Sequence, residues 1–153
     1  MTRLYLDTEF NGFGGALMSV ALVPSTPGAA EFYRVLDLHF RPEPWVEHHV
    51  IPHLGRASES RDVVSAALAE YLRSVASPVL VADWPTDFEH VLALLITGPG
   101  QMQRVPDFGM EFMRLEGFNT AYHSKVPHNA LHDARALRDY CERQRLGQGG
   151  PHS

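Results

Sequence analysis

Cysteine is almost absent from this sequence, and long hydrophobic runs are missing altogether. Cys141 is the single cysteine, so no disulfide can form within the chain, and a reducing cytoplasm is the expected location. No stretch approaches the run of about 20 apolar residues that a membrane-spanning helix needs. Between Met1 and Asp7 the apolar segment is also too short for a secretory signal. The sequence therefore predicts a cytoplasmic protein without a membrane segment.

Positive charge is scarce as well. The chain has 13 Lys and Arg residues against 18 Asp and Glu, which gives a formal net charge of −5 with histidine neutral. This balance argues against a protein that holds long duplexes through many phosphate contacts. Divalent cations bound at an acidic site would offset part of the negative charge, so a short single-stranded nucleic acid stays compatible with the composition.

The remaining composition is that of one globular domain. The chain has 153 residues, of which 44% are hydrophobic and 20% are charged, and this is enough for a core of ordinary size. No internal repeat is visible. The glycine-rich segment 147–153 predicts a flexible tail, so we expect a single domain over residues 1–146.

The periodicity of the apolar residues predicts a mixture of strands and helices. Strands are expected at residues 3–7, 17–23, 31–38, 78–82 and 104–108. Helices are expected from Ser58 or Ser60 to residue 75, and at residues 87–96, 109–116 and 129–145. Prolines 42, 44 and 52 are expected to break up the region that holds them. The first three strands indicate an antiparallel meander, and the complete order indicates a five-stranded mixed sheet with helices packed on it, an α/β or α+β arrangement.

Two carboxylates stand at the end of the first predicted strand. In a strand, residues i and i+2 project from the same face, so Asp7 and Glu9 point the same way. Two neighbouring acids repel each other unless a cation lies between them, and Mg²⁺ and Mn²⁺ prefer oxygen ligands of this kind. The alternative is a pair of solvated acids before a glycine-rich turn.

A second acidic segment follows the apolar strand predicted at residues 78–82. Asp83 and Asp87 lie four positions apart, between this strand and the next predicted helix. Either acid can bind a cation. Capping of the helix is the alternative for Asp87.

The last predicted helix carries an acid at the margin of its apolar stripe. Asp133 lies beside Ala130 and Leu137 on the helix surface, so its carboxylate faces the sheet, where it costs free energy unless a charge compensates it. His128, five positions earlier, is free to reach the same place. The alternative is a first-turn acid that favours the helix dipole, preceded by an unrelated histidine.

Taken together, these three segments resemble the motifs of the DEDD superfamily of 3′–5′ exonucleases, in its histidine-bearing subclass. The first motif is similar to residues 4–9, the second to the segment that holds Asp87, and the third to His128 with Asp133. The resemblance spans nearly the whole chain in order and spacing. It implies an α/β fold of the ribonuclease H type and a nuclease that removes nucleotides from a 3′ end.

The resemblance also implies how these residues act. Two Mg²⁺ or Mn²⁺ ions, roughly 4 Å apart, would clamp the attacking and leaving oxygens of a phosphodiester. Asp7 would bridge both ions, and Asp87 would support one of them. Glu9 and Asp133 would complete the coordination of the other ion, which holds the attacking water. His128 would take the proton from that water.

A closer likeness favours RNA as the substrate. Residues 45–52, Trp-Val-Glu-His-His-Val-Ile-Pro, are similar to the Trp-Val-x-x-His-Val-x-Pro stretch of a small bacterial exoribonuclease group best known from mycobacteria. Asp83 stands where the second motif often carries asparagine, so either Asp83 or Asp87 could be the principal ligand, and Asp87 is preferred. Physical reasoning alone assigns Trp45 to packing and gives His49 no role. A homodimer is expected by analogy.

Candidate substrate contacts follow the first two motifs. They are Phe10, Asn11, Gly12, Asp83 and Trp84. Phe10 or Trp84 could stack on the terminal base, although core packing is the interpretation that the sequence favours for both. Common family members carry Thr-x-Gly where this chain has Phe-Asn-Gly. The rival functions are an inactive nucleic-acid-binding module, a DNA-directed exonuclease and an unrelated metal-dependent phosphatase.

Overall fold

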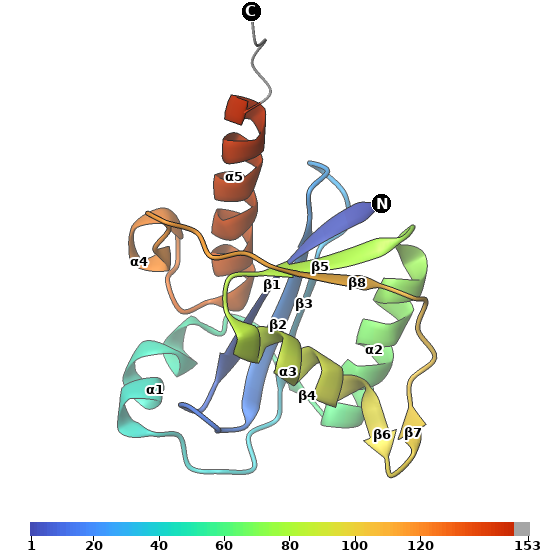
Figure 1. Ribbon diagram of the computed structural model, residues 1–153. Helices are drawn as coiled ribbons and strands as arrows, with labels where there is room; N and C mark the ends of the chain where they lie inside the picture. The colour runs from blue at the N-terminus through green and yellow to red at the C-terminus, as the bar shows by residue number, and fades with distance from the viewer. Residues whose placement is uncertain (149–153) are drawn as a thin grey trace, which may run out of the picture.

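The computed structural model describes residues 1–148 and contains a mixed six-stranded sheet (Figure 1). Its strands are β1 (Thr2–Phe10), β2 (Leu17–Pro24), β3 (Phe32–Leu36), β4 (Ser58–Glu59), β5 (Pro78–Ala82) and β8 (Gly109–Phe112). Their order across the sheet is β4-β3-β2-β1-β5-β8. The first three strands pair antiparallel, which confirms the predicted meander. β5 lies parallel to both β1 and β8, so the carboxyl ends of these three strands meet at one edge.

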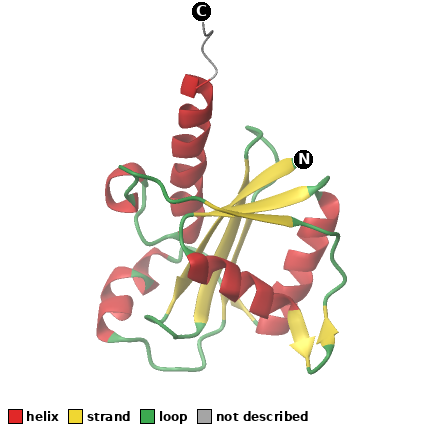
Figure 2. Ribbon diagram, in the orientation of Figure 1, coloured by secondary structure: helices red, strands yellow, loops and turns green. Residues whose placement is uncertain are grey.

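Helices cover both faces of this sheet (Figure 2) and confirm the predicted α/β class. They are α1 (Pro44–His49), the 3₁₀ turn η1 (Ile51–His53), α2 (Arg61–Ser74), α3 (Pro85–Leu95), α4 (Thr120–His123) and α5 (Ala130–Gln148). The alternation along β1 separates two cores: Leu4 and Leu6 pack with α2 and α3, whereas Tyr5 packs with α5. The same alternation continues to the end of β1, where it decides which side each polar residue takes.

The last strand of the sheet differs from the prediction. Residues 104–108, predicted as a strand, have no regular structure, and residues 109–112, predicted as part of a short helix, form β8. Pro106 lacks the amide hydrogen that a strand inside a sheet needs. Val105 and Phe108 instead pack against the core under α2 and α3, while β8 pairs with β5. With the two-residue β4, the sheet has six strands rather than the five expected.

Several short elements were not predicted. A hairpin of β6 (Ile96–Gly98) and β7 (Gln101–Met102) follows α3, and α4 precedes the last helix. α1 occupies the region that prolines were expected to break up. Pro44 stands in the first turn of α1, where a missing amide hydrogen costs nothing because that amide has no partner within the helix.

The longer helices agree with the predictions to within a few residues. Of the two candidate caps for α2, Ser60 is the one in place, because its side chain accepts a hydrogen bond from the amide of Val63 at 3.3 Å. α5 continues to Gln148, two residues into the predicted tail, and the rest of that tail, 149–153, lies outside the described residues. Over residues 1–148, no helix combines the length and the apolar character that crossing a membrane requires.

Candidate active site

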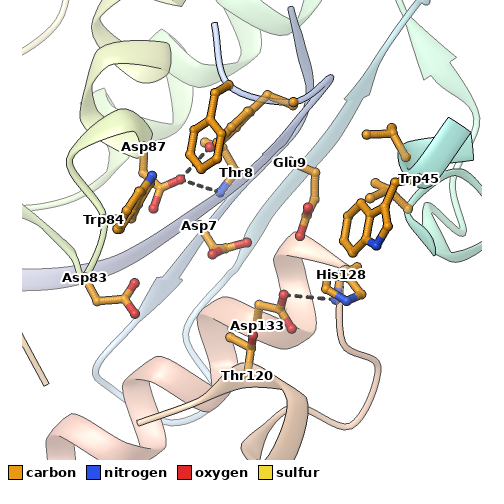
Figure 3. A pocket seen from close by; sticks show the side chains of 15 residues that line it. Asp7, Thr8, Glu9, Trp45, Asp83, Trp84, Asp87, Thr120, His128 and Asp133 are labelled. Atoms are coloured by element: carbon orange, nitrogen blue, oxygen red, sulfur yellow. Dashed lines mark hydrogen bonds between the residues drawn. The ribbon is translucent and has the colours of Figure 1, made fainter. Parts of the chain in front are cut away.

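The five residues that the three motifs predict come together at one end of the sheet (Figure 3). They line one cavity of about 520 Å³. The end of β1 supplies Asp7 and Glu9, the first turn of α3 supplies Asp87, and the start of α5 supplies His128 and Asp133. Segments from the beginning, the middle and the end of the chain therefore build a single site.

Three of these carboxylates are close enough to share a cation. Asp7 and Glu9 project from the face of β1 that carries Tyr5, so they point toward α5, and Asp133 points back at them from its first turn. One oxygen from each of the three acids lies within 4.8 Å of the other two. Asp7 Oδ2 and Asp133 Oδ1 are inaccessible to solvent and have no hydrogen-bond partner among residues 1–148.

Buried oxygens without a partner are costly, and a cation between them would satisfy both. Carboxylate oxygens suit Mg²⁺ and Mn²⁺ in particular. None of the described residues that line the cavity is a lysine or an arginine, so no side-chain cation takes this place. The residues present thus fit a divalent metal ion.

The pKa values of these acids reflect the same crowding. Burial, and then the charge of Asp87, raise the pKa of Asp7 well above its ordinary value. Burial and then the charges of Asp133 and Asp87 raise the pKa of Glu9 to about 8. Burial raises the pKa of Asp133 to about 6, although the backbone amide of His128 acts in the opposite direction. The site therefore disfavours the charged forms of its acids, and a bound cation would stabilise those forms.

Asp87 is held from the opposite face of β1. Thr8 projects toward α3, and its backbone amide (3.2 Å) and its hydroxyl (2.5 Å) both donate to Asp87 Oδ1. Asp87 is 2% exposed, and burial raises its pKa to about 7 against the effect of Thr8. Asp83 lines the same cavity, with its carboxylate pointing toward Asp7 (Figure 3), and burial raises its pKa too. Both acids of the second motif thus reach the site.

His128 lies at the turn into α5, with a φ of 67°, a left-handed conformation in which histidine is enriched. This turn lets the backbone amide of His128 donate to Asp133 Oδ2 at 3.1 Å. The ring packs edge-on against Trp45, with the ring centroids 5.0 Å apart. Burial, followed by the charges of His49 and His53, lowers the pKa of His128, so the ring is neutral near pH 7 and can accept a proton.

Asn129 fixes this turn, and the sequence analysis did not identify it. Its Oδ1 accepts a hydrogen bond from the amide of His132 at 3.1 Å, which caps α5. Its Nδ2 donates to the carbonyl of His53 at 2.7 Å. Asn129 therefore joins the start of α5 to the end of η1. The only local signal for this role is an asparagine just before a predicted helix.

Aromatic side chains form the rim of the cavity. Phe10, Phe13, Trp45 and Trp84 all line it. Trp84 is 49% exposed, so the core-packing interpretation is wrong for this residue. Phe13, which the sequence analysis missed, is 87% exposed, and its ring centroid lies 6.4 Å from that of Trp84. Phe10 is partly buried and packs against His90.

The predicted substrate contacts divide into two groups. Phe10, Gly12, Asp83 and Trp84 line the cavity, whereas Asn11 does not. Asn11 Oδ1 accepts the backbone amide of Glu43 at 2.7 Å, which fastens the turn after β1 to the segment before α1. Asn11 thus supports the rim without lining the cavity.

No model of a known protein family matches this chain, and no curated protein matches it either. What the site can do follows from its own geometry. Clustered carboxylates can hold cations, a neutral histidine beside them can accept a proton, and exposed rings at the rim can contact flat apolar groups.

Proposed function

We propose that this protein is a metal-dependent 3′–5′ exonuclease of ribonuclease H-like fold, which hydrolyses phosphodiester bonds at the 3′ end of RNA and releases nucleoside 5′-monophosphates. The observation that carries the proposal is the convergence of Asp7, Glu9, Asp87, His128 and Asp133 on one cavity. Their positions along the chain match the three motifs that suggested this activity.

Each of these residues then has a definite task. Asp7, Glu9 and Asp133 would hold one divalent cation, and Asp7 with Asp87 would hold a second. Bound there, the ions supply a polarised water and offset the negative charge that develops on the leaving 3′ oxygen. His128 would accept the proton from the attacking water, because its ring is neutral near pH 7.

The aromatic side chains at the rim favour a nucleic acid over a small phosphoester as the substrate. Stacking of a base on an aromatic side chain contributes roughly 1–3 kcal/mol and accepts any base. Phe13 and Trp84 offer exposed rings at the cavity for such stacking. A net charge of −5 fits a short single strand better than a long duplex.

The test is the release of mononucleotides from 3′-labelled oligonucleotides by the purified protein. Matched RNA and DNA oligomers, single- and double-stranded, are incubated with Mn²⁺ or Mg²⁺, with EDTA as the control. Stepwise shortening of RNA that depends on the metal supports the proposal. Binding without release would indicate an inactive module, and equal cleavage of a generic phosphomonoester would indicate a phosphatase. Shortening of DNA but not of RNA would show that the substrate is DNA.

A further inference from the structure

A second cavity, of about 130 Å³, lies beside the first turns of α5. Its charged and titratable lining residues are His123, Lys125, His132, Arg135, Arg138 and Asp139. Asp139 is the one acid among the described residues that line it. Asp139 and the neighbouring Glu31 form ion pairs with Arg135 and Arg138. Three cations thus face two acids, which leaves a small excess of positive charge here in a chain with a net charge of −5.

The basic groups are held in place by the fold. His132, Arg135 and Asp139 recur at helical spacing on one face of α5, and the segment 123–125 lies against that face. Glu31 fixes Arg135 by accepting from Nε at 3.1 Å and from Nη2 at 2.6 Å, and Arg135 Nη1 has no partner within residues 1–148. Lys125, the only lysine of the sequence, makes no ion pair in the described part of the chain.

This basic cavity and the active-site cavity border the same two segments. On α4, Thr120 lines the active-site cavity and His123, one turn later, lines the basic cavity. On α5, Asp133 lines the first and its neighbour His132 the second. Figure 3 shows Thr120 beside Asp133 at the wall of the active site. A strand that leaves the active site over this wall would bring its phosphates to the basic cavity.

We infer that the basic cavity binds a backbone phosphate of the RNA strand whose 3′ end occupies the active site, an inference that rests on the proposed function. The cavity has 130 Å³, a quarter of the 520 Å³ of the active site, which suits a single phosphate group. Guanidinium and ammonium groups are the usual partners of phosphate oxygens. The contact would favour oligomers over dinucleotides, because Lys125 lines this second cavity and not the active-site cavity.

The test measures RNA binding in a variant that should keep its metal and lose most of its turnover. His128→Ala protein in Mn²⁺, with and without Lys125→Gln, is titrated with fluorescent RNA of two and of eight nucleotides at several salt concentrations. We expect Lys125→Gln to weaken binding of the longer RNA roughly 3- to 10-fold at low salt and to lower the salt slope by about 0.7. Binding of the dinucleotide should not change. Lys125→Arg should retain the affinity, and Arg143→Gln, exposed on α5 but outside the cavity, is the matched control.

A footprint gives a second measurement, because Lys125 is the only lysine. Amine acylation followed by peptide mass spectrometry reports directly on its side chain, and the longer RNA should protect it. Unchanged affinity of Lys125→Gln for the longer RNA, or full acylation in its presence, would overturn the inference. Protection by inorganic phosphate but not by RNA would show a free-anion site instead. Failure of the proposed function would be seen in a different measurement, because the wild-type protein would then release no nucleotides.

Discussion

Replacing Glu9 with glutamine is expected to stabilise the metal-free protein at neutral pH. Burial, and then the charges of Asp133 and Asp87, raise the pKa of Glu9 from 4.5 to about 8. Folding therefore favours the protonated form, and this group lowers stability progressively as the pH rises from 4.5 toward 8. At pH 7.5, about three units above the ordinary pKa, the limit is about 4 kcal/mol at 1.36 kcal/mol per unit. Because the carboxyl group is partly exposed, we expect a gain of about 1–3 kcal/mol.

The assay is thermal or urea unfolding of the wild type and Glu9→Gln in EDTA, at pH 5 and pH 7.5. A gain near 2 kcal/mol corresponds to a rise in Tm of about 4–8 °C for a domain of this size. At pH 5 the gain should shrink below about 1 kcal/mol, because this pH is only about half a unit above the ordinary pKa of 4.5, so the proton that Glu9 holds in the folded state costs little free energy. Glu70→Gln, exposed on α2, should show no such pH dependence. An equal gain at both pH values, or none at pH 7.5, would refute the raised pKa assigned to Glu9.

Substitutions of three further residues test individual parts of the site. Asp7→Asn should abolish turnover and also remove the stabilisation by Mn²⁺ seen in unfolding curves, because Asp7 is the acid shared by both proposed ion positions. His128→Ala should lower kcat by about 10²–10⁴-fold while stabilisation by Mn²⁺ persists, and equal loss of both would argue against its role as a base. Thr8→Val should reduce stability by about 1–3 kcal/mol together with activity, whereas Thr8→Ser should retain both, since the hydroxyl holds Asp87.

The parts of this fold that local periodicity determines were predictable from the sequence. The meander and the helices α2, α3 and α5 follow from apolar spacing, and the acids at strand and helix ends follow from the same pattern. β8 was not predictable, because its existence depends on pairing with β5 and not on its own sequence, which is exposed at most positions. The helix α1 was not predicted for a different reason. Pro44 was expected to break the chain there, but a proline breaks a helix only in its interior and is tolerated in the first turn.

The same distinction separates the site residues that were found from those that were missed. Carboxylates can be recognised in the sequence by their charge. The alternation of side chains along a strand places Asp7 and Glu9 on one face, whichever strands pair with it. Thr8 has no such signal, because the acid it holds lies 79 positions away. Trp45 meets His128 only after α1 and α5 have packed at the same end of the sheet. Contacts between distant segments thus decide which neutral residues support the charged ones.

The acids that would bind the metal ion lower the stability of the folded protein as long as no ion is bound. Asp7, Glu9 and Asp133 have raised pKa values, so their charged forms reduce the stability of the metal-free protein at neutral pH. An ion that binds only the folded protein stabilises it by RT ln(1 + [L]/Kd), and the relief of repulsion contributes to that affinity. Occupancy of the site can therefore be followed as a rise in Tm with Mn²⁺ concentration, before any substrate is supplied. Loss of this rise in Asp7→Asn, with its retention in His128→Ala, would separate the residues that hold the ion from the one that moves the proton.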